Sequence, residues 1–222
     1  MAAFTFFDSS KKAYKRILED ITHAKKSIYL ETYIYDDDEV GQKFRKVLEK
    51  KAEQGVKEKL LVDAWGSTVR KEYFARLRKL GGEAVLFREF QYVIRMFTKN
   101  HKRDHRKLII IDDSVTYIGS LNISATTLNW RESTLRIEDE VLSYLFKQTS
   151  EPIWAIYNIY NKIKRVKVYT YQEFSIVSDY ASQLRKPLQK RYLQLLKGAR
   201  KEILIETPYF VPSDRIIKSL IK

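Results

Sequence analysis

The sequence has no cysteine, no long apolar segment and comparatively few acidic residues. The absence of cysteine excludes disulfides and thiolate metal sites. The longest purely aliphatic run, Leu108–Ile111, is far shorter than the roughly 20 residues that a membrane-spanning helix needs. The N-terminus, MAAFTFFDSSKK, lacks the basic start and the long apolar stretch of a signal peptide. We therefore expect a chain that is soluble or bound peripherally to a membrane.

Basic residues dominate the charge, because 42 Lys and Arg stand against 28 Asp and Glu, for a net charge of +14. A balance of this size favours an anionic partner, either nucleic acid or an anionic membrane surface. Residues 88–104 mix aromatic with basic side chains. This stretch is either a solvated loop, a segment that docks at lipid headgroups, or part of a nucleic-acid groove.

Hydrophobic periodicity alternates between strand and helix along the chain. Strands are expected at residues 27–35, 59–62, 83–87, 105–112, 115–122 and 202–207. Helices are expected after Ser10, after Asp38, and at residues 68–80, 139–162 (with a break at Glu151-Pro152) and 184–197. This order predicts an α/β layered domain with a mixed, largely parallel sheet.

A repeat connects the two ends of the chain. Residues 15–35 match residues 190–210 without a gap, at an offset of 175, with eight identical positions that include Glu31/Glu206. A repeat at this spacing indicates duplicated domains, although two helix–strand units can also share such a pattern by chance. We predict a first domain over residues 1–163 and the start of a second, similar domain over residues 164–222. A second catalytic motif is then expected at about position 280.

The residue types that carry chemistry gather in residues 105–122. They form the pattern His105-x-Lys107-x4-Asp112-x6-Gly119-Ser120-x-Asn122. Alternation along a strand points His105 and Lys107 to one face. If Asp113-Ser114 is a two-residue hairpin loop, Lys107 lies opposite Ser120 and His105 lies opposite Asn122. We therefore expect an imidazole, an ammonium, a hydroxyl and an amide on one patch.

Such a patch suits a phosphodiester reaction, in which the His105 imidazole attacks phosphorus while the other groups bind the non-bridging oxygens. Asp112 has the opposite strand parity and lies roughly 20 Å from His105 along the strand, so we assign it a structural role at the turn. Glu132 is either the acceptor that fixes the His105 tautomer or a solvated side chain. His101 is expected in an exposed loop and Asp63 in a turn.

The motif and its surroundings resemble the phospholipase D superfamily, and more narrowly the bacterial cardiolipin synthases. The resembling segments are residues 24–41, 60–67, 104–122, 130–139 and 206–214. The resemblance implies a phospholipase D-like α/β/α sandwich followed by a second one, related by a pseudo-twofold, with each domain giving one motif to a shared site. One histidine then forms a phosphohistidine and the other acts as general acid and base, without metal or cofactor.

Carried over by position, His105, Lys107, Ser120 and Asn122 are active-site residues, and Glu132 is the histidine-orienting carboxylate. The leading hypothesis is a phosphatidyltransferase that makes cardiolipin or a related phospholipid, acting peripherally at the cytoplasmic face of the membrane. Its partners are anionic phospholipid and the second half of the same full-length chain; these 222 residues alone are expected to be inactive.

Two alternatives stay open. In the first, the same site hydrolyses phosphodiesters, as a phospholipase D or as a metal-independent nuclease, and the net charge of +14 favours the nuclease version. The chain is otherwise a non-catalytic membrane-binding fragment. Homodimerisation would complete the site of a chain with one motif, but the partial second repeat argues against it.

Overall fold

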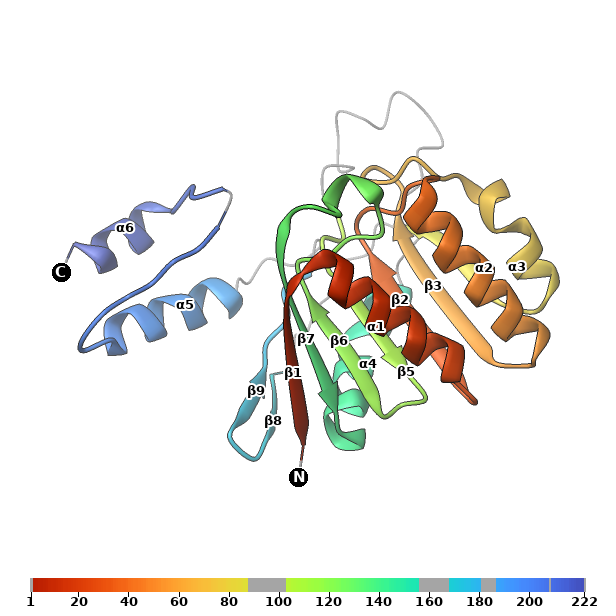
Figure 1. The fold of residues 1–222 in the computed structure, drawn as a ribbon. Helices are drawn as coiled ribbons and strands as arrows, with labels where there is room; N and C mark the ends of the chain where they lie inside the picture. Colours follow the sequence, from red (N-terminus) through yellow and green to blue (C-terminus); the bar gives the residue numbers. More distant parts are fainter. Residues whose placement is uncertain (1, 88–102, 156–167, 181–186, 208, 222) are drawn as a thin grey trace.

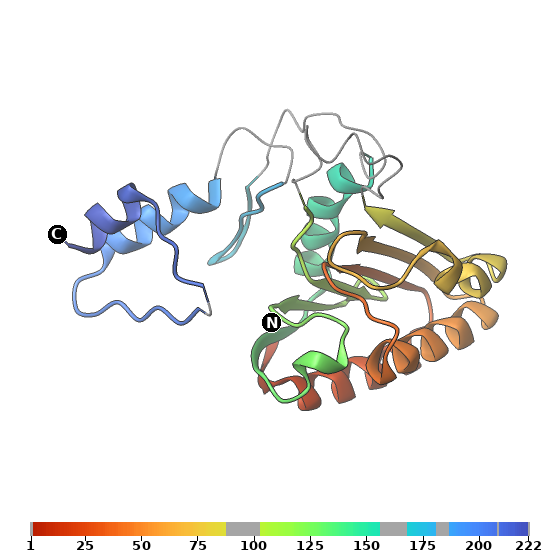
Figure 2. The same ribbon diagram turned by 90° about the horizontal axis from the view of Figure 1, so that it is seen from above.

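A seven-stranded sheet between two helical layers forms the main body of the protein (Figures 1 and 2). The structure is a computed structural model that describes residues 2–87, 103–155, 168–180, 187–207 and 209–221. The strands are β1 (Ala3–Ser9), β2 (Ser27–Thr32), β3 (Lys57–Asp63), β4 (Glu83–Phe87), β5 (Leu108–Ile111), β6 (Val115–Gly119), β7 (Arg131–Glu138), β8 (Tyr169–Tyr171) and β9 (Phe174–Ile176). The α-helices are α1 (Ser10–His23), α2 (Glu39–Glu53), α3 (Ala75–Lys79), α4 (Glu140–Trp154), α5 (Pro187–Gly198) and α6 (Asp214–Leu220), with short 3₁₀ turns at Lys71–Phe74 and Ala125–Thr127.

The strand order is β1-β7-β6-β5-β2-β3-β4. The pairs β2–β3 and β3–β4 are parallel, whereas β1–β7, β6–β7, β5–β6 and β2–β5 are antiparallel. The predicted α/β architecture with a mixed sheet is confirmed, but the prediction that the sheet is largely parallel is wrong. The reason lies in the connections, because β5, β6 and β7 follow one another without a crossover helix and short connections join antiparallel neighbours.

Helices α1, α2 and α3 cover one face of the sheet, and α4 with the β8–β9 hairpin covers the other (Figures 1 and 2). Ile109 of β5 packs with Ile17 and Phe44 on the first face. Its neighbour Ile110 packs with Phe146 on the second face. Side chains of β5 therefore alternate between the two helical layers, and this alternation decides where the residues just before β5 point.

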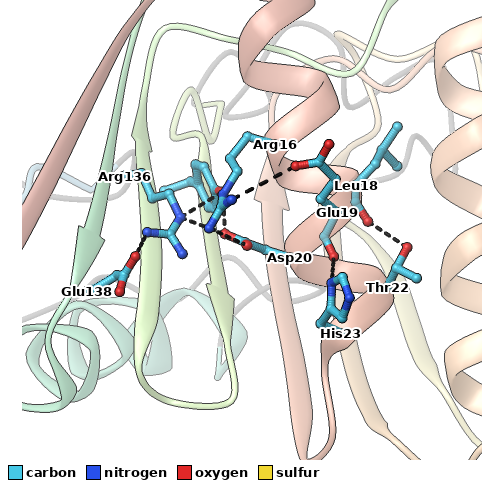
Figure 3. Close-up of polar contacts among 9 residues, drawn as sticks. Arg16, Leu18, Glu19, Asp20, Thr22, His23, Arg136 and Glu138 are labelled. Atoms are coloured by element: carbon cyan, nitrogen blue, oxygen red, sulfur yellow. Dashed lines mark hydrogen bonds and ion pairs between the residues drawn. The ribbon is translucent and has the colours of Figure 1, made fainter.

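Polar contacts fasten α1 to the sheet (Figure 3). Asp20 of α1 accepts hydrogen bonds from Arg136 Nε at 2.6 Å and from the Tyr117 hydroxyl at 2.5 Å. Arg136, which is buried, also pairs with Glu138. One helix is thereby tied to β6 and β7.

Asp38 fastens α2 in a similar way. Its carboxylate caps the helix by accepting hydrogen bonds from the N–H groups of Val40 and Gly41, which confirms the cap predicted at residues 36–38. The other carboxylate oxygen accepts from Ala125 N at 2.5 Å. One side chain therefore fixes both the start of α2 and the segment that follows the motif.

Two elements differ from the sequence-based expectations. β1 was not predicted, because it pairs with β7 from the far side of the domain and local patterns do not reveal such a partner. α4 runs unbroken through Pro152 to Trp154, so the predicted break is wrong. Pro152 lies in the last turn of α4, where the missing N–H removes one backbone hydrogen bond. Only the end of the helix is affected, and the preceding turns stay intact. Residues 156–162 of the expected helix lie outside the described residues.

Residues 169–180 pack on the main body. Ile176 joins the core next to α4, the Phe174 ring lies 5.2 Å from the ring of Phe4, and the Tyr180 hydroxyl donates to the Thr149 carbonyl at 2.8 Å. This segment contains the β8–β9 hairpin.

Helices α5 and α6 stand apart from the sheet (Figures 1 and 2), and neither contains a buried residue. The helix predicted at residues 184–197 is confirmed over Pro187–Gly198. The strand predicted at residues 202–207 is not formed, because this segment has no neighbouring strand within the part of the chain that the structure describes. Its apolar side chains are left in solvent, with Leu204 93% exposed. Across the described ranges, no helix is both long and apolar enough to cross a bilayer.

Candidate active site

The turn between β5 and β6 corrects the predicted hairpin register. Ile111 pairs with Val115, and both Asp112 and Asp113 have left-handed backbone angles (φ 54° and 55°). The loop therefore spans residues 112–114, one residue longer than predicted, and the alignments of Lys107 with Ser120 and of His105 with Asn122 are wrong. The cause is visible at Asp112, whose N–H donates to the Ser27 carbonyl at 2.8 Å and so joins the neighbouring strand.

The Asp112 carboxylate bonds to the backbone at the hairpin turn, where its strand parity placed it, and its structural role stays a prediction. It accepts hydrogen bonds from the backbone N–H groups of Lys25, Lys26 and Ser27 at the start of β2. Partial burial raises the pKa of Asp112, but these hydrogen bonds outweigh burial and bring the pKa below its ordinary value. Asp112 thus joins the tip of the hairpin to the first strand of the repeat, far from the histidine of the motif.

His105 and Lys107 lie just before β5 and face the same aromatic ring, which confirms that they share one side of the strand. The His105 ring lies 4.6 Å from the Tyr33 ring, and Lys107 Nζ lies 5.3 Å from the same ring. Lys107 Nζ also donates to the His105 carbonyl at 2.9 Å. The imidazole and the ammonium are therefore neighbours on a common support.

Tyr33 is held in place by the turn after β3. Ser67 Oγ donates to the Tyr33 carbonyl at 3.2 Å. A Cβ on Gly66 would come within 2.4 Å of that carbonyl oxygen, so only glycine allows this approach. Residues 60–67 resemble the family in sequence. Through Gly66 and Ser67 they hold the backbone of Tyr33, on which His105 and Lys107 pack.

Asp63 anchors the segment that leads into the motif. Its carboxylate accepts hydrogen bonds from the N–H groups of Trp65 and Gly66, which confirms the predicted turn role. The second oxygen accepts from the N–H of Asp104 at 2.9 Å, directly before His105. A turn residue of β3 therefore also positions the nucleophile candidate, a link that sequence reasoning missed.

Ser120 and Glu132 meet each other. The Ser120 hydroxyl donates to the Glu132 carboxylate and accepts from the Ser133 N–H at 3.0 Å. β6 and β7 approach closely here, because a Cβ on Gly119 would lie 2.1 Å from the Ser133 carbonyl oxygen. The glycine of the motif is thus required by packing. Within the described residues, Glu132 makes no hydrogen bond to His105, so its orienting role stays a prediction.

Asn122 links the motif to the end of β2. Its side-chain oxygen accepts from the Ile34 N–H at 3.1 Å, which leaves the amide NH₂ as the group available to a ligand. Its backbone carbonyl accepts from the Tyr14 hydroxyl at 2.7 Å. Asn122, Lys107 and Gly119 line one partly open cavity. The amide and the ammonium therefore share a cavity, whereas His105 and Ser120 do not line it, so the patch of four groups stays a prediction.

The site holds a neutral imidazole next to an ammonium whose pKa is lowered. Desolvation, helped by the Lys107 charge and partly offset by Asp104, lowers the pKa of His105 below its ordinary value. Burial lowers the pKa of Lys107 to about 8, although Asp104 and Glu132 act in the opposite direction. At neutral pH the imidazole is therefore neutral and nucleophilic, and the ammonium still carries its charge.

Among the described residues, His23 lies away from this geometry. It is exposed at the end of α1, where its Nδ1 lies 2.8 Å from the Glu19 carbonyl oxygen. His101 and residues 88–102 of the aromatic–basic stretch lie outside the described residues. Over the ranges that are described, no group of three or more metal-ligating side chains comes together.

Comparison with known proteins places the chain within a family. Residues 17–154 match the family described as "Cardiolipin synthase, PLD-like domain". A cardiolipin synthase of Clostridium perfringens is 29% identical over 97% of this chain and 48% of its own length. The major cardiolipin synthase ClsA of Bacillus subtilis is 31% identical over 93% of this chain and 46% of its own length. The chain spans about half the length of the curated relatives it matches.

Solved structures agree on the fold. Nuc of Salmonella typhimurium, described as a phospholipase D family member, superposes with a TM-score of 0.53 at 19% identity. The match covers 70% of this chain and 95% of that one. The predicted fold and the suspected resemblance are both confirmed.

Proposed function

Because the chain belongs to the family of cardiolipin synthase, PLD-like domains, we propose that its full-length protein is a phosphatidyltransferase that forms cardiolipin or a related phospholipid. The observation that carries the proposal is the pairing of a neutral imidazole, His105, with the Lys107 ammonium on one aromatic support. A phosphodiester reaction needs this nucleophile and this charge side by side.

The first step of the proposed reaction transfers the phosphatidyl group to His105. A ring nitrogen attacks phosphorus and forms an N–P bond, while the P–O bond to the leaving glycerol breaks. Lys107 and the NH₂ group of Asn122 bind the non-bridging oxygens as negative charge develops. The leaving oxygen takes a proton from a second histidine, which is expected at about position 280.

The second step releases the product. The second histidine, now without its proton, takes a proton from the hydroxyl group of a phosphatidylglycerol acceptor. The hydroxyl oxygen attacks phosphorus, the N–P bond breaks, and His105 returns to its neutral form. Ser120 enters only indirectly in this scheme, because its single proton is used on Glu132.

The proposed partner in this site is the second half of the same chain. The repeat at residues 190–210 supports a second domain of the same kind. Residues 169–180 pack on the first domain, which supports a boundary after Tyr180 and not at residue 163. The net charge of +14 supports peripheral binding to anionic lipid, and the cytoplasmic face remains part of the proposal.

The experiment that tests the function uses the full-length protein in vesicles of phosphatidylglycerol, with a chelator present. Cardiolipin should accumulate with release of glycerol, and His105→Ala should lower turnover by at least about 10³-fold, as loss of a covalent nucleophile does. Retained turnover in His105→Ala would overturn the assignment of the nucleophile.

The hydrolytic alternative is tested in the same preparation. Water in place of the lipid acceptor would give phosphatidic acid, and DNA or RNA in place of lipid would give cleaved strands. Nucleic-acid cleavage without lipid turnover would favour a nuclease, for which the positive charge is the supporting observation.

A further inference from the structure

A buried ionic cluster lies directly behind the motif, around the residue between His105 and Lys107. Arg106 Nη2 lies 2.8 Å from Glu31 Oε2, and Arg106 Nε lies 3.1 Å from Asp104 Oδ1. Arg106 Nη1 donates to the Thr149 carbonyl at 2.9 Å. Glu31 is only 1% exposed, so the cluster belongs to the interior of the protein.

Three structural elements converge on this guanidinium. Glu31 comes from β2, where the Tyr29 hydroxyl also donates to it. The Thr149 carbonyl comes from α4 and also accepts from the Tyr180 hydroxyl. The ring of Tyr180 lies 5.4 Å from the guanidinium. The N–H groups of the Arg106 guanidinium thus meet Glu31, Asp104 and the Thr149 carbonyl, and the ring of Tyr180 lies close to the guanidinium.

Stability does not explain the cluster. Burying charges costs free energy that their attraction rarely returns in full, and apolar residues of the same volume are often as stable. Burial raises the pKa of Glu31 above its ordinary value, although Arg106 acts to lower it. Because the pKa of Glu31 is higher in the folded than in the unfolded protein, the unfolded state loses this proton first as pH rises. The free energy of unfolding therefore falls between the unfolded pKa and the folded pKa of Glu31.

The place of Arg106 in the strand offers a better explanation. Side chains alternate here, so Arg106 points toward α4 while His105 and Lys107 point to the opposite face. Residues 103–107 form no regular strand pairing, so backbone hydrogen bonds of the sheet do not fix this segment. Anchoring the middle residue on the far face therefore sets the direction of both neighbours.

We propose that Arg106 and Glu31 are positioning residues that hold His105 and Lys107 in the geometry for phosphodiester attack. The proposal rests on the function proposed above for His105. Displacement of a reacting group by about 1 Å costs on the order of 10²-fold in rate, so a rigid anchor at this position has a direct catalytic consequence.

The repeat provides an independent expectation. Glu206 occupies the place of Glu31 in the second copy and is exposed, with its carboxylate 3.6 Å from Arg131 Nη1. If Glu31 acts through the residue between His and Lys, the second motif should carry an arginine at about position 281, at the same offset. Any residue there that cannot pair with a carboxylate would contradict the extension to the second half.

The decisive experiment compares two double variants of the full-length protein. Glu31→Gln/Arg106→Met removes both charges of the Glu31–Arg106 pair together, so that Glu31 is not left as an unpaired buried charge, while Asp104 loses its contact with Arg106 Nε. Asp20→Asn/Arg136→Met removes another largely buried ion pair, which joins α1 to the sheet (Figure 3) and, among the described residues, makes no hydrogen bond or ion pair to the motif. Turnover, KM and the melting temperature are measured for both.

We expect kcat of Glu31→Gln/Arg106→Met to fall about 10²-fold with KM within about threefold, while the control keeps kcat within about threefold at a similar loss of melting temperature. Equal kcat in the two variants, or a normal kcat in the first, would overturn the proposal. His105→Ala is included in parallel, because its retained turnover would instead overturn the proposed function.

A third variant covers the case in which the double variant does not fold. Arg106→Lys keeps the charge but cannot bond two carboxylates and a carbonyl at once. We expect kcat to fall about tenfold and the titration of the His105 ring, followed by NMR, to move toward its ordinary pKa as contact with Tyr33 loosens. An unchanged kcat and an unchanged His105 titration would contradict the inference.

Discussion

The two copies of the repeated helix–strand unit have similar sequences and opposite environments. In the first copy, α1 and β2 bury an apolar face, and Leu30 is 0% exposed. In the second, α5 forms but buries nothing, and Ile205, which matches Leu30, is 46% exposed. The helix therefore forms without a buried face, whereas the strand needs a neighbouring strand with which to pair.

The comparison also separates two kinds of residue in the first copy. Glu31 and Tyr33 face the motif segment only because β5 pairs with β2. The corresponding Glu206 meets only a surface arginine. A carboxylate at this position becomes part of a site when the rest of the sheet is present.

The strongest way to break the comparison is to extend the chain past Lys222 through the expected second motif. Residues 202–207 should then enter a sheet, and their amide hydrogen exchange should slow by on the order of 10³-fold or more. Exchange of the β2 amides serves as the control and should not change. Equal exchange rates at residues 202–207 in the short and long chains would show that the two copies are not equivalent.

A matched pair of substitutions sharpens the difference in burial. Leu30→Ala should lower the free energy of unfolding by about 2–5 kcal/mol, because it opens a cavity in a closed core. Ile205→Ala in the same chain should cost less than about 0.5 kcal/mol, because the side chain is in solvent. Urea unfolding measures both, and a large cost at Ile205 would mean that the second copy is already packed.

The turn residue Asp112 tests what holds the first copy in the sheet. Asp112→Ala removes the acceptor of three backbone N–H groups and should cost about 1–3 kcal/mol. Asp113→Ala is the control, because it has the same backbone strain but an exposed carboxylate. Turnover per folded molecule should stay normal in the full-length protein if Asp112 is structural.

The pH dependence of Asp112→Ala has a definite sign. The folded pKa of Asp112 is lowered, so its contribution is present above the unfolded value of about 4 and is lost as pH falls through the folded value. The difference in stability from the parent chain should therefore shrink in acid. A difference in the free energy of unfolding that does not change with pH would mean that the Asp112 carboxylate does not cause it, and that the altered backbone of the turn does.

The smallest expected effect is in the pH dependence of kcat/KM, which reports on His105 and Lys107. In the full-length protein, kcat/KM should rise with pH as His105 loses its proton below about pH 6.5. The value of kcat/KM should fall above about pH 8 as Lys107 loses its proton, by up to about tenfold per pH unit. Lys107→Arg should shift the alkaline limb upward, and an unmoved limb would assign it to another group.

The motif shows what a sequence reveals and what it conceals. The shared side of His105 and Lys107 follows from strand alternation, and the structural role of Asp112 follows from its parity. The register of Ser120 and Asn122 does not follow, because it depends on a turn in which two aspartates take left-handed angles. Arg106 and Glu31 are 75 positions apart, and only the pairing of β5 with β2 brings them together.

The exposed residues 203–205 also have a consequence for the order of events during synthesis of the protein. A ribosome adds about 5–20 residues each second, so a partner strand near the expected second motif would follow this segment by several seconds. During that interval the apolar side chains of residues 203–205 would stay in solvent, where an unpaired segment can pair with a neighbouring copy. The order of synthesis would then make this short segment a site at which chaperone binding and aggregation compete.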